Sequence, residues 1–149
     1  MKAIGIIVLL LVVGLGAVTV FVTKEPDRTL DAQGQTWVDG YDAWRAVTAR
    51  QVNTAQRRMA FETPAKNTRL LQPLRSCGRR LAQIGEPPTL LVDVKAAALQ
   101  ACGEVQVALA KDRQYGQAAY ATMRLHLAEV EDRLDLAQRS LTIALEGPT

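Results

Sequence analysis

The sequence has few of the residues that carry catalytic or metal chemistry. Its 149 residues include one histidine and two cysteines, and only 5% are aromatic. One histidine and two cysteines cannot complete a structural zinc site, which needs four ligands. His126 and Glu129 lie one helical turn apart, which is half of a carboxylate–histidine site, and no second histidine is present to complete it. We therefore predict no metal and no cofactor.

Recognisable nucleophile arrangements are also missing. The two serines, Ser76 and Ser140, stand at no readable spacing from His126. Cys77 lies on an apolar helix face, where a thiol is inert. Asp39 and Asp42 flank the aromatic stretch WVDGYDAW, but on a helix they project away from its rings and form no carbohydrate site. These observations predict that the protein is not an enzyme.

The N-terminal stretch lacks charge. No charged residue occurs from Ala3 to Val22, and twenty helical residues span about 30 Å, enough to cross a hydrocarbon core. A cleaved signal peptide is the alternative, with a shorter apolar region and a small-x-small cleavage site. Because bulky residues end this run (Val20, Phe21 and Val22), we favour an uncleaved signal-anchor. A buried core helix is a third reading.

The flanking charges predict the orientation of this anchor. The N-terminal amine and Lys2 lie on one side, whereas the first four charged residues on the other side sum to zero (Lys24, Glu25, Asp27 and Arg28). The positive-inside rule then places the N-terminus in the cytoplasm and exports the remainder to the periplasm or cell surface. We expect a transmembrane signal-anchor over 1–23, a polar connector over 24–34 and an extracytoplasmic helical bundle over 35–149.

The exported part shows no alternating strand pattern, and proline and glycine separate helical periodicities. We expect helices over about 31 or 35 to 61, 64–84 with a bend or restart at Pro73, 89–113, and from beyond Gly116 to about 146. Short connections favour antiparallel neighbours. The predicted fold is all-α: a single transmembrane helix followed by an antiparallel three- to four-helix bundle, or helical hairpins with coiled-coil-like packing.

Three apolar seams indicate which helix faces pack together. The last helix carries a heptad seam of residues spaced three and four apart: Tyr120, Met123, Leu127, Val130, Leu134, Ala137, Leu141 and Ala144. The third helix carries a seam of smaller residues: Leu91, Val94, Ala98, Ala101, Val105 and Ala108. The first helix aligns Trp37, Tyr41, Trp44 and Thr48, which we assign to the core, with a membrane-interface position for the tryptophans as the alternative.

The two cysteines lie on inward helix faces. Cys77 shares a seam with Leu74 and Leu81, and Cys102 lies beside Ala101 on the third helix. In a hairpin that turns at Gly85–Thr89, helical rise places them about 12 and 20 Å from the turn. A disulfide requires Cα atoms within about 7 Å, so tilt or an asymmetric turn must absorb the difference. We predict a Cys77–Cys102 disulfide; buried free thiols and an intermolecular bridge are the alternatives.

The charge, +3 in total, is distributed unevenly. Basic residues dominate from Arg57 to Arg80, and acidic residues dominate from Glu129 to Glu146. One group of arginines lies opposite the leucine–cysteine seam and forms a predicted partner-binding face, with a simple solvated face as the alternative: Arg69, Arg75, Arg79 and Arg80. Its candidate partners are anionic lipid, an anionic polymer or an acidic protein surface, including the last helix of a second copy. No aromatic residues interleave these arginines, so we predict no nucleic-acid binding.

Together these patterns predict a non-enzymatic, membrane-anchored helical protein. It would act as a structural or interaction subunit of the cell envelope and bind another envelope or membrane protein, with self-association as a further mode. The alternative function is a secreted helical binding module or inhibitor, released by signal-peptide cleavage.

Overall fold

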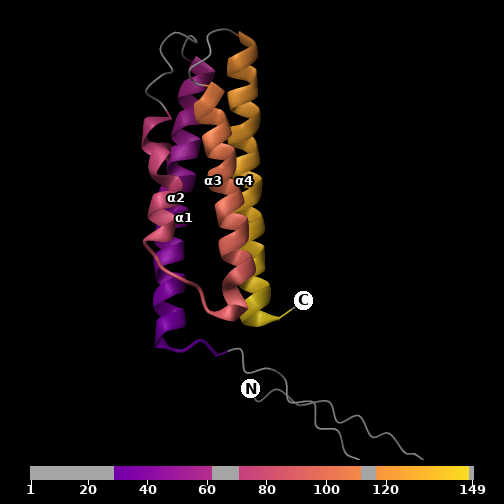
Figure 1. The fold of residues 1–149 in the computed structure, drawn as a ribbon. Coiled ribbons are helices and arrows are strands. Elements are labelled where there is room, and N and C mark those ends of the chain that lie inside the picture. The colour runs from indigo at the N-terminus through magenta and orange to yellow at the C-terminus, as the bar shows by residue number, and fades with distance from the viewer. Residues whose placement is uncertain (1–28, 62–70, 112–116, 148–149) are drawn as a thin grey trace, which may run out of the picture.

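The computed structural model describes residues 29–61, 71–111 and 117–147, and within these ranges the chain is helical with no strand. The elements are α1 (Ala32–Phe61), the 3₁₀ helix η2 (Gln72–Ser76), α2 (Cys77–Ala82), the 3₁₀ helix η3 (Thr89–Leu91), α3 (Val92–Lys111) and α4 (Gln117–Glu146). The helices form a bundle, and successive helices run in opposite directions along its axis (Figure 1). The predicted all-α class is confirmed.

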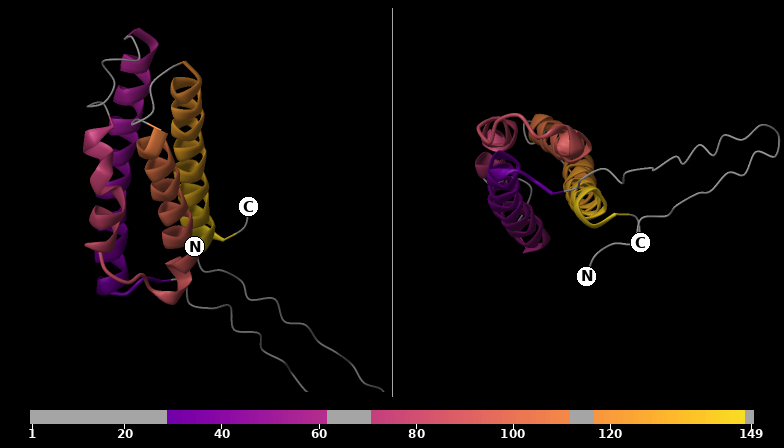
Figure 2. Two further views of the ribbon diagram at one scale, coloured as in Figure 1. Left: turned by 45° about the horizontal axis from the view of Figure 1, so that its top comes forward. Right: turned by 90° about the horizontal axis from the view of Figure 1, so that it is seen from below.

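The bundle has two halves. Viewed from below, α1 and α2 lie together on one side, and α3 and α4 lie together on the other (Figure 2). The contact between α3 and α4 is the most extensive in the fold, whereas α2 is short and contacts both α1 and α3. The start of α1 and the end of α4 lie at the same end of the bundle (Figure 1).

Among the described residues, no helix combines the length and the apolar composition needed to cross a membrane. The predicted transmembrane segment, 1–23, and residues 24–28 of the predicted connector, 24–34, lie outside the described residues.

The first helix begins at Ala32, inside the predicted connector, because the preceding residue caps it. The Asp31 carboxylate accepts a 2.7 Å hydrogen bond from the backbone N–H of Gly34, one of the N–H groups that a helix start leaves without a partner. The connector therefore ends nearer to residue 31 than to residue 34.

The predicted second helix, 64–84, is shorter and more irregular than expected over its described part. Residues 64–70 lie outside the described residues, and the chain then forms η2 and α2 in succession. Pro73 lies in the first turn of η2, where its missing N–H costs no helical hydrogen bond. The restart expected at Pro73 is thus a 3₁₀ turn that leads into one and a half turns of α-helix.

The two seams of α3 and α4 meet within one chain. The α3 seam is fully buried, and on α4 Met123, Leu127, Val130, Leu134, Ala137 and Leu141 are buried while Tyr120 and Ala144 pack at its edge. The small residues of α3 allow the two helix axes to approach closely. The α4 seam is therefore occupied inside the chain, so a homodimer through this seam would require the α3–α4 hairpin to open.

The aromatic stripe of α1 packs into the core. Trp37, Tyr41, Trp44 and Thr48 are all buried, and the Trp37 and Tyr41 rings stack with centroids 5.6 Å apart. Gly40 permits a close approach here, since a Cβ atom at this position would lie 2.9 Å from the Ile84 side chain. Burial excludes the alternative in which the tryptophans lie at a membrane interface.

Candidate interaction surfaces

The predicted disulfide between α2 and α3 is present in the structure. The Cα atoms of Cys77 and Cys102 are 5.6 Å apart, and the bridge closes a loop with a sequence separation of 25. Closing a loop of this length stabilises the fold by about 3.5 kcal/mol in the chain-entropy model. Because Cys77 is the first residue of α2, this bridge fixes the start of the short helix against the middle of α3.

An asymmetric turn brings the two cysteines to the same height. The chain leaves α2 through Gly85, whose φ of 94° is readily adopted only by glycine, and runs without helix to Pro88. This non-helical segment carries the chain from the end of α2 to the lower end of α3 (Figure 1). Extended residues advance about 3.3 Å each. A few of them are enough to span the difference in height along the helix axes that the sequence predicts between Cys77 and Cys102.

Two tryptophans and one arginine fix α2 to α1. The Trp44 indole N–H donates a buried 3.1 Å hydrogen bond to the carbonyl of Cys77, and the Trp37 indole donates to the carbonyl of Gly85 at 3.3 Å. The Arg80 guanidinium donates a 2.8 Å hydrogen bond to the side-chain carbonyl of Gln51. With the disulfide, these contacts hold both sides of α2.

The predicted arginine face is divided by this arrangement. Arg75 and Arg79 are exposed on the outer side of η2 and α2. Arg80, expected on the same outward face, instead turns towards α1 and its Nε atom is buried, because α1 occupies that flank of α2. Arg69 lies outside the described residues. Two of the four predicted arginines are therefore available to a partner in the described structure.

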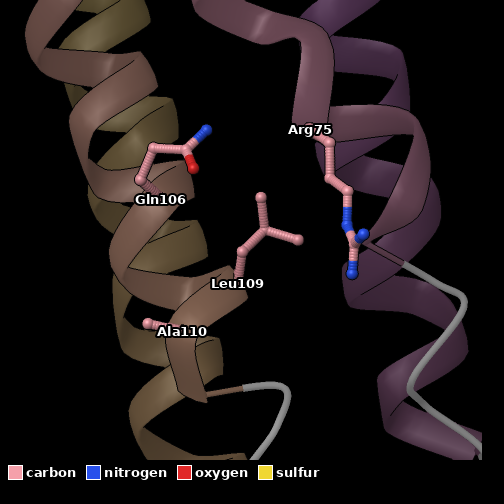
Figure 3. Close-up of a pocket in the computed structure, with 4 residues that line it drawn as sticks. All are labelled: Arg75, Gln106, Leu109 and Ala110. Carbon is pink, nitrogen blue, oxygen red and sulfur yellow. The ribbon is translucent and has the colours of Figure 1, made fainter.

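A cavity of about 370 Å³ lies beside Arg75, between η2 and the upper part of α3. Figure 3 shows Gln106 and Leu109 projecting from α3 towards this space, with Arg75 on the opposite wall and Ala110 at the edge. Its volume lies at the small end of the range for ligand sites. The described residues that line it are one arginine, one glutamine and two apolar residues. The guanidinium and the amide suit an anionic group. They provide no acid–base pair for catalysis.

The charges of the described residues are separated from one end of the bundle to the other. The end at which α1 finishes, at the top of Figure 1, carries basic residues of α1, α3 and α4, and η2–α2 adds three arginines beside the middle of α1; we call this group the basic end: Arg50, Arg57, Arg58, Arg75, Arg79, Arg80, Lys111 and Arg124. The end at which α1 begins carries most of the carboxylates, with Lys95 and Arg139 among them; we call this the acidic end: Asp31, Asp39, Asp42, Glu86, Asp93 and Glu146. Along the chain, basic residues are concentrated in the middle and acidic residues near the C-terminus. Because the helices are antiparallel, this becomes a separation of charge along the bundle axis.

The residues considered for catalysis do not converge. His126 makes a 2.7 Å contact with Glu104 across the α3–α4 interface, and Ser140 lies about 21 Å further along α4 by helical rise. The Cys77 thiol is used in the disulfide. Asp39 and Asp42 are exposed while the neighbouring rings are buried. No group of three or more potential metal ligands occurs in the described ranges.

Tyr41 is the one described residue with a strongly shifted pKa. Burial raises the pKa of its hydroxyl to about 12, with Asp42 adding to this shift and Arg45 opposing it. The hydroxyl has no hydrogen-bond partner among the described residues. A neutral phenol without an adjacent base has no role in proton transfer, so Tyr41 acts as a core residue.

Comparison of the chain with protein-family models, curated proteins and solved structures finds no match.

Proposed function

We propose that this protein is a non-enzymatic, membrane-anchored interaction subunit of the cell envelope. In this proposal the N-terminus is cytoplasmic and the helical bundle lies outside the cytoplasm. The uncharged run from Ala3 to Val22 supports an anchor, and the disulfide supports export, since structural disulfides persist mainly in oxidising compartments.

The basic end is the observation that carries the proposed binding role. An anchor that precedes α1 would hold the acidic end of the bundle nearest to the bilayer, because α1 begins at that end. The contacts from Trp37 and Trp44 place α2 beside the middle of α1, so Arg75 and Arg79 lie about 15–25 Å from its start by helical rise.

This distance favours a partner other than the anchoring membrane. The field of an anionic leaflet falls off within a Debye length, about 8 Å at physiological salt, and it repels the acidic end. An upright bundle would therefore present its arginines away from the bilayer. The partner that fits this geometry is an acidic surface on another envelope protein.

Because α2 is held on both sides, Arg75 and Arg79 project from a fixed backbone. A side chain on a loosely held segment loses more conformational entropy on binding than one on a fixed element. The disulfide and the Trp44 hydrogen bond hold the backbone of this segment before any partner arrives. Preorganisation of this kind increases affinity without additional contacts.

Charge reversal tests the proposal. The double variant Arg75→Glu/Arg79→Glu is compared with Arg139→Glu, an exposed arginine at the acidic end of α4. The variants are expressed with an affinity tag, and partners are co-purified from detergent-solubilised membranes. We expect the double variant to lose its main partner and Arg139→Glu to retain it, with both variants folded by circular dichroism. Equal recovery of partner by the double variant would refute the basic end as the binding surface.

The mass of the mature protein tests the anchor separately. An intact chain in the membrane fraction supports the signal-anchor, whereas a soluble chain shorter by about 20 residues would support the secreted binding module instead.

A further inference from the structure

The cavity beside Arg75 lies next to the disulfide, which joins its two walls. Arg75 comes two residues before Cys77 on the η2 wall. Gln106 comes about one helical turn after Cys102 on the α3 wall. Because the bridge holds the Cα atoms of the two cysteines 5.6 Å apart, it fixes the separation of the walls before any ligand binds. A site that is formed in advance loses little conformational freedom when a ligand fills it.

The two walls present different chemical groups. Figure 3 places Arg75 on one wall, and Gln106 and Leu109 project from the other. Arg75 and Gln106 are exposed, and neither side chain makes an ion pair or a hydrogen bond with the described residues. No carboxylate is among the described residues that line the cavity, so none of them neutralises the arginine charge.

This lining favours a ligand that combines a carboxylate with an apolar group. A guanidinium binds a carboxylate through two parallel hydrogen bonds, and the Gln106 amide N–H can donate to the same group. The side chains of Leu109 and Ala110 offer a surface for an apolar group. A helical turn about 10 Å wide with a 5.4 Å pitch occupies about 420 Å³. The cavity of about 370 Å³ therefore accepts the side chains of a short segment rather than a complete helix.

We propose that this cavity receives an acidic side chain of the partner together with an adjacent apolar side chain. The inference rests on the proposed function, which assigns an acidic protein surface to the arginines of η2 and α2. The inserted carboxylate accepts hydrogen bonds from Arg75 and Gln106, and the apolar side chain packs against Leu109. Arg79 lies one helical turn from Arg75, outside the described lining, and acts through its charge. Enclosed anchor residues contribute most of the binding energy of an interface, whereas rim charges mainly affect the rate of association.

Two matched peptides test the ligand class without the natural partner. The full chain in detergent, with its disulfide intact, is titrated with N-acetyl-leucyl-glutamate amide and with its glutamine counterpart, and NMR shifts of the backbone amides of residues 106–110 report binding. We expect the glutamate peptide to bind about tenfold more tightly, the effect of one hydrogen bond to a charged group. Acetate, which lacks the apolar group, should bind more weakly than the glutamate peptide. Equal binding of the two peptides, or acetate binding as tightly as the glutamate peptide, would overturn the proposal.

Variants of the two walls locate the peptide. We expect Arg75→Gln to weaken binding of the glutamate peptide about tenfold and Arg79→Gln to weaken it only about twofold, because a rim charge contributes less than a direct hydrogen bond. Ala110→Trp adds bulk at the edge of the cavity and should also abolish the shifts, whereas Ala46→Trp adds the same bulk on the exposed face of α1 and should not. Thermal unfolding confirms that each variant is folded. Equal effects of Arg75→Gln and Arg79→Gln would show that a general positive field, and not the cavity, holds the peptide.

The peptide titration and the partner co-purification fail in different ways. If the peptides bind equally but Arg75→Glu/Arg79→Glu loses its partner, the cavity is refuted as the insertion site and the basic end stands as the binding surface. If the glutamate peptide is preferred but the double variant keeps its partner, the basic end is refuted, and the partner is refuted as the occupant of the cavity with it.

Discussion

The two halves of the bundle are held together by different means. The α3–α4 half consists of long helices with continuous buried seams, so it is stabilised by distributed apolar packing. The α1–α2 half also buries aromatic and leucine side chains, but it contains a helix of only six residues, which is held in addition by single contacts: one disulfide, two indole hydrogen bonds and one arginine–glutamine contact. Apolar packing stabilises both halves, and in the α1–α2 half the additional contacts fix the position of a charged surface.

Introducing a charge into the α4 seam should have the largest effect. Leu134→Asp places an unpaired carboxylate at a position that is 2% exposed, whereas Leu136→Asp changes a residue on the same helix that is 38% exposed. We expect Leu134→Asp to destabilise the fold by about 4 kcal/mol or more and Leu136→Asp by about 0.5 kcal/mol at most. Chemical denaturation of dilute protein measures both. Similar losses in the two variants would show that the α3–α4 packing is not organised around this seam.

Removing the disulfide should have the next largest effect and should act mainly on the α1–α2 half. We expect the double variant Cys77→Ala/Cys102→Ala to lose about 3 kcal/mol, on the order of 10 °C in Tm. Hydrogen exchange should increase most in α2 while the centre of α4 remains protected. A uniform increase across all helices would contradict the separation into two differently held halves.

The indole hydrogen bonds should differ in strength. Trp44→Phe removes the indole donor to the buried Cys77 carbonyl, and we expect a loss of about 1 kcal/mol. Trp37→Phe removes a longer, partly buried contact to the Gly85 carbonyl, which Lys95 also contacts, and should cost less. Thermal unfolding of the two variants provides the comparison, and a larger loss for Trp37→Phe would reverse the assigned order.

The Tyr41 hydroxyl should make the smallest contribution at neutral pH. Because its folded pKa is raised from 10.0 to about 12, the folded state retains a proton that the unfolded state loses, and stability falls as the pH rises from 10 to 12. Tyr41→Phe should remove this contribution to the alkaline loss and be neutral or slightly stabilising at pH 7, since the hydroxyl has no described partner. Denaturation curves at pH 7, 10 and 12 measure the effect, and an unchanged alkaline loss would contradict the assignment.

The sequence predicts the helices and their inward faces because both depend on local periodicity. The α4 seam and the aromatic stripe could be assigned from spacing alone, and so could the inward position of both cysteines. The orientation of Arg80 could not, because it depends on where α1 lies beside α2. The non-helical turn from Gly85 to Pro88 also depends on the tertiary arrangement, since only the height of α3 decides how far the chain must travel.

The exposed side of α3 could be recognised only from the structure. The spacing of the small residues of α3 identifies the buried seam, but the helix is apolar on most of its circumference, so composition does not distinguish its exposed face from the buried one. Only the position of the neighbouring helices identifies Leu99 and Gly103 as exposed. Likewise, the charge separation along the bundle becomes visible only when antiparallel folding brings basic residues of α1, α3 and α4 to one end.

The thiol content of the natural protein tests the central claim most directly. Protein purified from membranes is denatured, alkylated without reduction and examined by mass spectrometry. Our account predicts no alkylated cysteine and a peptide pair linked through Cys77 and Cys102, because the disulfide both fixes α2 and requires an oxidising compartment. Two alkylated cysteines would contradict the fastened α1–α2 half and the exported location together.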